Sequence, residues 1–266
     1  MHEKGTLFHR PHARKNHVVK EDYSKFAEVY NKFPAQPAGI LGSQLMKNAI
    51  GDASGLVVLD LGGGTGVHAR DALDAGARRV DLVDITLQML QVAEDIEQAQ
   101  GHSGRIRVFE GDVASTLGHL PLEPTYDIVM ANWVFDHAES PEMLERMWQN
   151  VEKYLKPSGK FVGIRAADLG PDLQTEKYGV TYYNFKSIRG GLAYTFMLHG
   201  DCPRAFEATS MEASYSGSTA MHEKHGLTDV RIVPLESAAI VQQQAEFWKT
   251  FLDKPPFFVV TAVKKG

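Results

Sequence analysis

The stretch VVLDLGGGTG, residues 57–66, constrains the fold of this chain more than any other. Its first three residues are an apolar run of the kind found in strands buried on both faces. Asp60 ends that run, and a glycine-dense turn follows before a helical pattern. The glycines at alternate positions are Gly62, Gly64 and Gly66. Because glycine accepts positive φ and lets a ligand approach the backbone, the stretch predicts a strand, a ligand-binding turn and a helix.

The carboxylate of Asp60 narrows the class of ligand expected at this turn. Glycine turns that bind phosphate do so through backbone N–H groups at a helix start, where a nearby anion brings no benefit. A cationic group, such as the amino group at the methionine end of S-adenosylmethionine, would instead be attracted by Asp60. The turn therefore indicates S-adenosylmethionine rather than a dinucleotide as the cofactor.

Strands and helices alternate along the chain, after two helices that the sequence predicts over residues 21–33 and 39–50. The seven predicted strands lie at 57–60, 80–84, 106–108, 126–131, 161–165, 226–235 and 255–263. Such alternation is typical of a parallel sheet with right-handed crossovers. The sequence therefore predicts an α/β fold, with a seven-stranded Rossmann-like sheet and helices on both faces.

Residues 166–220 interrupt the alternation, and we expect them to form a small cap inserted after the fifth strand, over the carboxyl edge of the sheet. Strand-like pieces in this insertion lie at 180–183, 193–198 and 206–207. We expect a single domain over residues 21–266, preceded by an arm over 1–20. The arm holds four histidines, which would form either a metal site or a loosely docked segment. No metal-ligand spacing is evident there, so we predict no metal.

Composition limits the classes of function. The chain of 266 residues is 43% apolar and 23% charged, as in ordinary globular proteins. Its net charge of −5 argues against broad binding to nucleic acid. Cys202 is the only cysteine, which indicates a reducing compartment. The sequence has no membrane-length apolar run and no secretory signal, so we expect a cytoplasmic enzyme.

Polar residues follow four consecutive predicted strands, and ligands of open α/β sheets bind beyond these strand ends. After Asp60, they are Asp84, Asp112 and Asn132 with its neighbour Trp133. Asp84 lies 18 residues after Gly66, a spacing that suits a carboxylate bound to ribose hydroxyls. Its alternative role is that of an acid favoured at a helix N-terminus.

An adenine ring is expected beside Asp84. Ile85 and Met89 would sandwich the ring, Asp112 would accept a hydrogen bond from its amino group, and Val113 would donate one from its backbone. The alternative for Asp112 is a turn aspartate after Gly111.

The ordered motifs DLGGGTG, LVDIT, EGDV, YDIVMANWVFDH and LKPSGKF make the chain similar to the class I S-adenosylmethionine-dependent methyltransferases, over residues 20–165 and the terminal strands. DYSKFAEVYNKF, ANWVFDHAES, KYGV and PLES…FWKTFL further resemble the toxoflavin-type N-methyltransferases of azapteridine biosynthesis. That resemblance implies that Tyr23 and Tyr30 close over the methionine end of the cofactor. It also implies that Asn132 and Trp133 line the passage between cofactor and substrate. The chain departs from the resemblance at Asp136-His137, where an Asn-Tyr-like pair is expected.

Methyl transfer needs a base only when the acceptor loses a proton. His137 is the leading candidate for this general base, and its alternative role is that of a structural hydrogen-bonding residue. His199 in the cap is a second candidate. Tyr178 and Tyr182, with Tyr183 and Phe185, would either stack on a flat heteroaromatic acceptor or form the core of the cap.

The sequence predicts an S-adenosylmethionine-dependent methyltransferase acting on a small, heterocyclic metabolite, with nitrogen favoured over oxygen or sulfur. It lacks the Asn-Pro-Pro-Tyr pattern of enzymes that methylate base amines, which disfavours nucleic acid. An NAD(P)-dependent oxidoreductase is an alternative, because Gly64, Gly66 and Ala69 satisfy G-x-G-x-x-A. Asp60 and the lack of a Tyr-x-x-x-Lys pair oppose it. A non-catalytic subunit that binds S-adenosylmethionine is another, and the oligomeric state is open.

Overall fold

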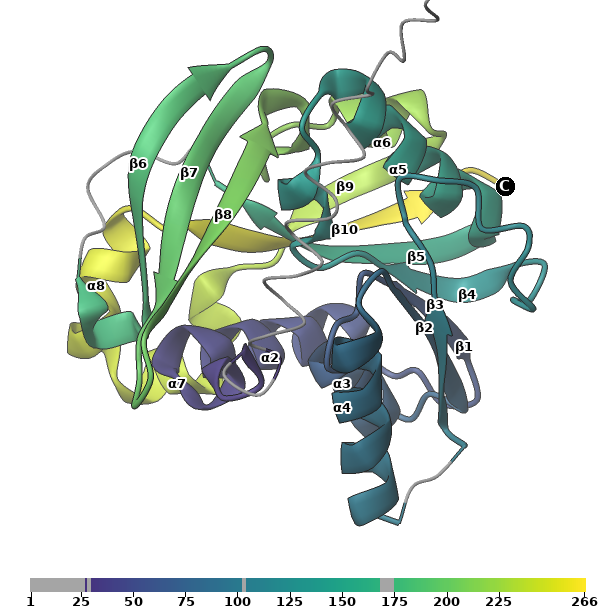
Figure 1. Ribbon diagram of the computed structural model, residues 1–266, viewed down its shortest axis with the longest axis horizontal. Coiled ribbons are helices and arrows are strands. Elements are labelled where there is room, and N and C mark those ends of the chain that lie inside the picture. Colours follow the sequence, from purple (N-terminus) through teal and green to yellow (C-terminus); the bar gives the residue numbers. More distant parts are fainter. Residues whose placement is uncertain (1–26, 28–29, 102–103, 168–174) are drawn as a thin grey trace, which may run out of the picture.

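Seven strands form one mixed sheet around which the rest of the chain is arranged (Figure 1). The computed structural model describes residues 27, 30–101, 104–167 and 175–266, so the predicted arm at 1–20 lies outside the described residues. The strands of the sheet are β1 (Val57–Leu61), β2 (Arg79–Asp84), β3 (Ile106–Glu110), β4 (Tyr126–Met130), β5 (Leu155–Ala166), β9 (Leu227–Ile232) and β10 (Phe257–Lys264). The predicted seven-stranded α/β fold is confirmed.

The strands lie in the order β3-β2-β1-β4-β5-β10-β9, and this order determines where a ligand crevice can form. Strands β1 to β5 pair in parallel, whereas β10 runs antiparallel to both β5 and β9. The chain reverses its direction of winding between β1 and β4, and in open parallel sheets a crevice forms beyond the carboxyl ends at such a point.

One prediction about the fifth strand differs from the structure. The LKPSGK segment, which we expected to form a turn before a strand at 161–165, lies within β5. The pairing of β4 with β5 shifts register between Tyr126 and Ile128, and Ser158 adopts a positive φ of 59°. The irregular residues are therefore accommodated as a bulge inside a longer strand.

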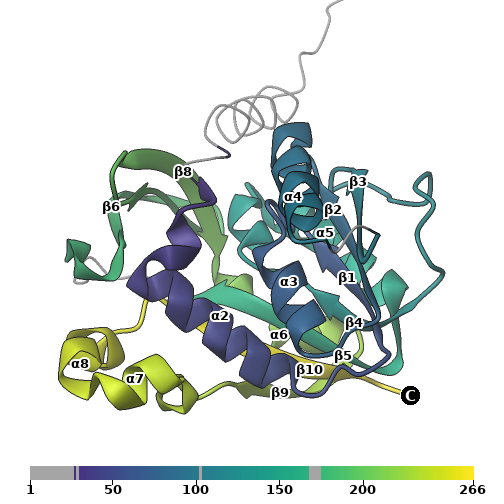
Figure 2. The ribbon, with the colours of Figure 1, turned by 90° about the horizontal axis from the view of Figure 1, so that it is seen from below.

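Helices cover both faces of the sheet, because side chains of the buried strands alternate between two apolar layers. In β1, Val58 packs in the layer with helices α2, α3 and α4, whereas Val57 and Leu59 pack in the layer with α5 and α6. The helices are α2 (Pro37–Ile50), α3 (Val67–Asp74), α4 (Leu87–Ala99), α5 (Pro141–Tyr154), α6 (Ala220–Lys224), α7 (Ala239–Gln243) and α8 (Ala245–Asp253). Figure 2 shows α7 and α8 beside α2. Within the described ranges, no helix is both long and apolar enough to cross a bilayer.

The insertion after β5 forms a second, three-stranded antiparallel sheet (Figure 1). Its strands, each longer than predicted, are β6 (Val180–Ile188), β7 (Gly191–Leu198) and β8 (Arg204–Met211). Strand β8 is fixed to the short 3-10 turn η2 (Val134–His137) and its following residue, since Thr209 Oγ1 donates to the carbonyl of Ala138 at 2.6 Å. The cap is thereby held at the carboxyl end of β4.

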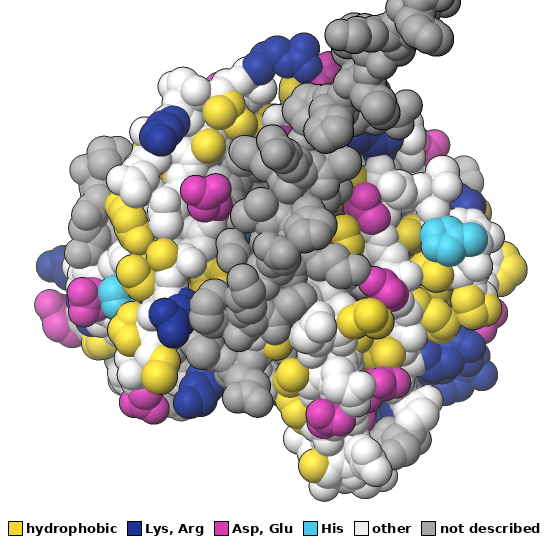
Figure 3. Space-filling model, in the orientation of Figure 1, with side chains coloured by type: hydrophobic (Ala, Val, Ile, Leu, Met, Phe, Trp, Pro, Cys, Tyr) yellow, Lys and Arg dark blue, Asp and Glu magenta, His cyan; other side chains and the backbone are white. Residues whose placement is uncertain are grey.

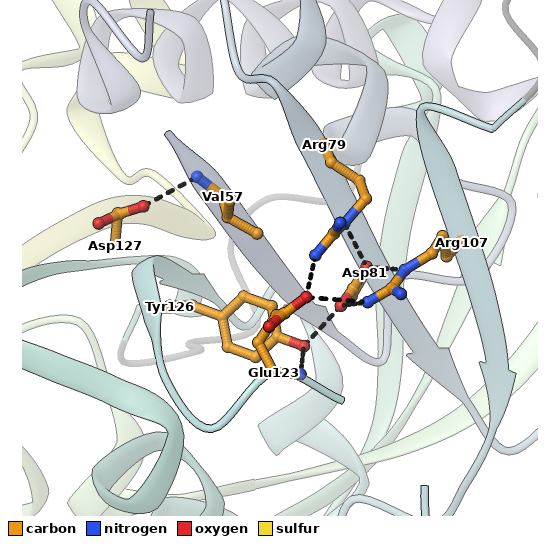
Figure 4. A network of polar contacts seen from close by, with 7 residues as sticks. All are labelled: Val57, Arg79, Asp81, Arg107, Glu123, Tyr126 and Asp127. Atoms are coloured by element: carbon orange, nitrogen blue, oxygen red, sulfur yellow. Dashed lines mark hydrogen bonds and ion pairs between the residues drawn. The ribbon is translucent and has the colours of Figure 1, made fainter. Parts of the chain in front are cut away.

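Asp81, in the middle of β2, is a fully buried carboxylate whose two oxygens are both satisfied (Figure 4). Arg107 of β3 donates to both oxygens, at 2.7 and 2.5 Å, and the Tyr126 hydroxyl of β4 donates at 2.6 Å. Arg79 forms an ion pair with Asp81 at 3.3 Å and another with Glu123. Because both oxygens of the buried carboxylate accept hydrogen bonds, this network links β2, β3 and β4 instead of leaving a buried charge unpaired.

We expect Tyr126→Phe to lower the free energy of unfolding by about 1–3 kcal/mol, because it removes a hydrogen bond to a buried charge. Urea denaturation followed by circular dichroism measures the change. Tyr154→Phe is the matched control: this ring packs 6.4 Å from Tyr126, and no hydrogen bond to its hydroxyl occurs among the described residues. It should change stability by less than about 0.5 kcal/mol. Equal effects of the two substitutions would contradict a role for the network.

Candidate active site

Three adjoining pockets lie at the carboxyl ends of the central strands. The rim pocket is lined by Tyr30, Gly62, Gly64, Asp84, Ile85, Thr86, Met89, Gly111, Asp112, Val113, Asn132, Trp133, Val134, His137, Met143 and Met147. The loop pocket is lined by Tyr30, Phe33, Pro34, Ala38, Gly39, Gly42, Asp60, Gly62, Gly63, Gly64, Thr65, Val67, His68, Asn132, Trp133, Ile164 and Phe257. The cap pocket is lined by Tyr30, Phe33, Trp133, Asp136, His137, Val180, Tyr182, Tyr194, Phe196, Leu198 and Ala208.

Tyr30 and Trp133 line all three pockets, so the pockets form one continuous site. Trp133 follows β4 and has a positive φ of 61°, which is rare for a bulky residue. Its ring lies edge-on to Phe257 of β10, with centroids 5.1 Å apart. A strained backbone held by packing is common at ligand sites, and here it sets the direction of the ring between the pockets.

Asp60 is the fully buried penultimate residue of β1, and neither of its carboxylate oxygens has a hydrogen-bond partner among the described residues. Burial raises the pKa of its carboxyl to about 6, with His68 partly opposing this effect. A buried, unpaired carboxylate is costly for the unliganded protein. Because Asp60 lines the loop pocket, its geometry suits a ligand that brings a hydrogen-bond donor or a positive charge.

The glycine loop surrounds Asp60 closely. At Gly62, where φ is +70°, a Cβ atom would lie 2.4 Å from Val134 Cγ2. At Gly63 it would lie 2.6 Å from Asp60 Oδ2 and 2.7 Å from Leu82 Cγ. Sequence reasoning singled out the alternate glycines and missed Gly63, although it belongs to the same run. Both positions require glycine for close approach, whereas only Gly62 requires it for its backbone angle.

The rim pocket brings together the five residues predicted to bind adenosine. Asp84 Oδ2 accepts a hydrogen bond from the Gly64 N–H at 3.0 Å, and its Oδ1 accepts one from the Thr86 N–H at 2.8 Å. Burial raises the pKa of Asp84 despite these hydrogen bonds. The carboxylate therefore organises the glycine loop and the start of α4 while also lining the pocket. Asp112 is comparable, since it accepts from the Ala114 N–H at 2.8 Å and lines the same pocket.

Asn132 joins the rim and loop pockets. Its Oδ1 accepts a hydrogen bond from the Ile164 N–H at 3.0 Å, which fixes the orientation of the amide. Its buried Nδ2 has no partner among the described residues. The site thus offers an unpaired buried donor at Asn132 and an unpaired buried acceptor at Asp60.

His137 lines both the rim and the cap pockets. Burial lowers the pKa of its imidazole to about 4, so the ring is neutral at neutral pH. A neutral imidazole can donate or accept a hydrogen bond, but with this pKa it is a weak proton acceptor.

Several residues singled out in the sequence do not line the three pockets. Gly66 is the N-cap of α3 and stands outside them, as does His199, whose Nε2 is 2.9 Å from Thr181 Oγ1. Tyr178 is fully buried: its hydroxyl donates to the Phe247 carbonyl at 3.0 Å, and its ring stacks on Trp248. Tyr178 therefore packs α8 against the insertion, and Tyr182 is the predicted cap tyrosine that lines the cap pocket. Tyr23 lies outside the described residues.

Asp136 of η2 is a further residue of the site, which the sequence marked only as a departure from a familiar pattern. Its position next to His137 was the available signal, but its burial depends on contacts with β8 that the local sequence does not show. Thr65 and His68 line the loop pocket as well and were not anticipated.

The charged side chains that line the site are predominantly acidic. Asp60, Asp84, Asp112 and Asp136 line the pockets, and none of the described lining residues is Lys or Arg. On the face in Figure 3, described Lys and Arg side chains lie in separate spots interspersed with acids. A pocket of this kind favours neutral or cationic ligands over phosphates. No group of three metal-binding side chains occurs among the described residues.

Comparison with known proteins agrees with this geometry. Residues 58–159 match the sequence model of a methyltransferase domain. The malonyl-[acyl-carrier protein] O-methyltransferase of Halalkalibacterium halodurans is 33% identical over 161 residues, which cover 58% of this chain and 56% of that protein. The chain spans about half the length of the curated relatives it matches.

Solved structures show the fold. The CcbJ methyltransferase of Streptomyces caelestis has a TM-score of 0.61 and 20% identity, covering 91% of this chain and 96% of its own. The 1,6-didemethyltoxoflavin-N1-methyltransferase of Burkholderia thailandensis, solved with 1,6-didemethyltoxoflavin and S-adenosylhomocysteine, has a TM-score of 0.56 and 18% identity. That match covers 99% of this chain and 94% of the other. The fold is therefore that of S-adenosylmethionine-dependent methyltransferases.

We expect Asp60→Asn to stabilise the unliganded protein by about 1–3 kcal/mol at pH 8, because it removes an unpaired buried charge. A carboxyl whose pKa is near 6 when folded and near 4 when unfolded binds more protons in the folded state between these values. Its ionisation therefore destabilises the fold as pH rises, and the gain from Asn should shrink as pH falls from 8 to 5.

Urea denaturation at the two pH values measures this difference. Asp95→Asn, at an exposed position of α4, is the control and should have an effect within about 0.5 kcal/mol at either pH. A loss of stability in Asp60→Asn at pH 8 would show that Asp60 is structural.

Proposed function

We propose that this chain transfers a methyl group from S-adenosylmethionine to a small, planar, nitrogen-containing metabolite. The unpaired, fully buried carboxylate of Asp60 beside the glycine loop is the observation that carries the proposal. It lies in a site at the switch point of the sheet whose described lining residues include no Lys or Arg. The methyltransferase domain match over residues 58–159 supports the same activity.

The unpaired atoms of the loop pocket fit the methionine end of the cofactor. Asp60 would accept hydrogen bonds from the ammonium group of the cofactor. The Asn132 Nδ2 group would donate a hydrogen bond to the carboxylate of the same methionine end. Tyr30, which lines all three pockets, would cover this end. Binding the ammonium group would offset the cost of burying Asp60, and this is a physical reason to retain such a residue.

The rim pocket fits the adenosine. Asp84 would bind the ribose hydroxyls, while Ile85 and Met89 would enclose the adenine ring. Asp112 and the backbone of Val113 would bind the edge of the ring, in the same pocket. Phosphates of NAD(P) at the glycine loop would lie beside the buried carboxylate of Asp60, with no cationic partner among the described lining residues, which makes an oxidoreductase the weaker explanation.

The cap pocket fits the acceptor. It meets the rim pocket at Trp133 and His137, and its walls carry the aromatic rings of Tyr182, Tyr194 and Phe196. Aromatic walls suit a flat ring system. The fold shared with the toxoflavin-related enzyme of Burkholderia thailandensis is consistent with a heterocyclic acceptor, although that similarity is distant at 18% identity.

The bound cofactor supplies a methyl group already activated by its sulfonium. The side chains of this chain then bind, orient and exclude water, and alignment of two reactants is itself a large part of catalysis. His137 lines both the rim pocket and the cap pocket, where cofactor and acceptor would meet, so we propose that its neutral imidazole positions them.

We expect S-adenosylmethionine and S-adenosylhomocysteine, but not NADPH, to stabilise the protein against heat. A ligand at 100 times its dissociation constant adds about 2.7 kcal/mol, which differential scanning fluorimetry detects as a shift of several degrees. Asp84→Ala should weaken S-adenosylhomocysteine binding by about 1–3 kcal/mol in calorimetry, because it removes a charged hydrogen-bond partner.

Asp95→Ala is the control, because Asp95 is exposed on α4, the helix that follows Asp84. This variant should bind S-adenosylhomocysteine like the wild type. Stabilisation by NADPH alone would overturn the proposed function. Undiminished affinity in Asp84→Ala would remove this residue from the cofactor site.

We expect His137→Ala to lower the rate of methyl transfer about tenfold or more while changing S-adenosylhomocysteine affinity by less than about twofold. The reason is that His137 lines the wall shared by the rim and cap pockets, and it is not one of the residues proposed to bind the adenosine. Transfer of radiolabelled methyl to an acceptor found in a screen of nitrogen heterocycles measures the rate. An unchanged rate would exclude His137 from the reaction.

A further inference from the structure

Asp136 is the second buried carboxylate of this site, and it lies in the cap pocket rather than with the cofactor loop. It is 5% exposed. Its Oδ1 accepts a hydrogen bond from Ser210 Oγ at 2.8 Å, whereas its Oδ2 has no partner among the described residues. Asp81 in the same protein shows that a purely structural buried aspartate can have both oxygens satisfied.

The position of the Asp136 carboxylate is set by the cap. Ser210 is fully buried in β8 and lies 3.0 Å, oxygen to oxygen, from the Tyr194 hydroxyl of β7. The neighbouring Thr209 donates to the carbonyl of Ala138, which holds the end of η2 against the same strand. Two strands of the cap thus fix one oxygen of Asp136, and the other is left to the pocket.

No described side chain of opposite charge forms a direct ion pair with Asp136. Arg165 of β5 lies close enough to favour the ionised carboxylate, yet no hydrogen bond or ion pair joins these two described side chains. The guanidinium instead donates to the Ala131 carbonyl at 3.0 Å and stacks over Phe135 at 4.1 Å. Arg165 is not among the residues that line the cap pocket.

The remaining described lining of the cap pocket is mainly aromatic and aliphatic. An anionic ligand there would meet a carboxylate without a cation, and a purely apolar ligand would leave Oδ2 buried and unpaired. A flat ring that presents a hydrogen-bond donor satisfies both the walls and the free oxygen.

We propose that Asp136 is the acceptor-binding carboxylate of the cap pocket, and that the methyl acceptor is a planar nitrogen compound that presents an N–H group to Oδ2. This inference rests on the proposed methyltransferase function and specifies its substrate class. The hydrogen bond is strongest when the N–H belongs to a protonated amine or ring nitrogen, because both partners are then charged. Burial raises the pKa of Asp136 to about 7, so the carboxylate is largely ionised at pH 8.

Three two-ring probes of similar shape test the assignment at pH 8 with saturating S-adenosylhomocysteine. They are 4-aminoquinoline, which is cationic and carries N–H groups, quinoline, which at this pH lacks an N–H donor, and 1-naphthoate, which is an anion. Isothermal titration calorimetry should show that the wild type binds 4-aminoquinoline at least about tenfold more tightly than quinoline, and binds 1-naphthoate most weakly.

Asp136→Asn is nearly isosteric and removes the charge. In this variant the affinities for 4-aminoquinoline and quinoline should agree within about twofold, while S-adenosylhomocysteine affinity stays as in the wild type, which also shows that the variant is folded. Glu207→Gln removes a carboxylate of the same strand β8 that is exposed, and should retain the full preference. Ser210→Ala keeps the charge of Asp136, so this variant should still bind 4-aminoquinoline more tightly than quinoline.

Equal affinity of the wild type for the three probes, or no binding of 4-aminoquinoline, overturns the assignment of Asp136 and leaves the proposed function standing if S-adenosylhomocysteine binds. Retention of the preference in Asp136→Asn overturns it as well. Failure of S-adenosylhomocysteine to bind the wild type instead overturns the proposed function.

Discussion

Burying a carboxylate costs desolvation free energy, and whether hydrogen bonds offset that cost distinguishes the aspartates of the sheet from those of the pockets. Asp81 is buried with donors from two other strands of the sheet, and it links β2, β3 and β4. Asp60 is buried equally deeply and accepts no hydrogen bond from the described residues, and Asp136 has one oxygen satisfied. The same side chain is therefore fully satisfied within the sheet in one place, whereas in the others it retains acceptor oxygens that the described protein groups do not satisfy.

The sheet topology brings the unsatisfied groups together. Parallel strands end at one edge, and the reversal of strand order between β1 and β4 opens a crevice there. Asp60 is the penultimate residue of β1, Asp84 ends β2 and Asn132 follows β4, so three polar groups from distant parts of the chain lie around one site. The helices on both faces close the core behind them and leave this edge as the place for a ligand.

Residues next to strand ends could be predicted from the sequence, because a strand's apolar run, its terminal acid and the following turn are local patterns. Asp84, Ile85, Met89, Asp112 and Val113 were identified in this way, and all line the rim pocket. Tyr178 and His199 could not be placed by the same reasoning. Both lie in the insertion, where the direction of a side chain depends on what packs against it, as α8 packs against Tyr178.

The sequence by itself determined the α/β sheet, the glycine loop and the row of carboxylates at the strand ends, since these follow from periodicity and from residues close together in the chain. The tertiary structure alone decided which carboxylates are left without partners. Whether Asp136 is satisfied depends on Ser210, which lies 74 residues away along the chain, and on the packing of the cap against η2. Hydrogen bonding and desolvation depend on which residues lie close in space, so they cannot be predicted from a local sequence pattern.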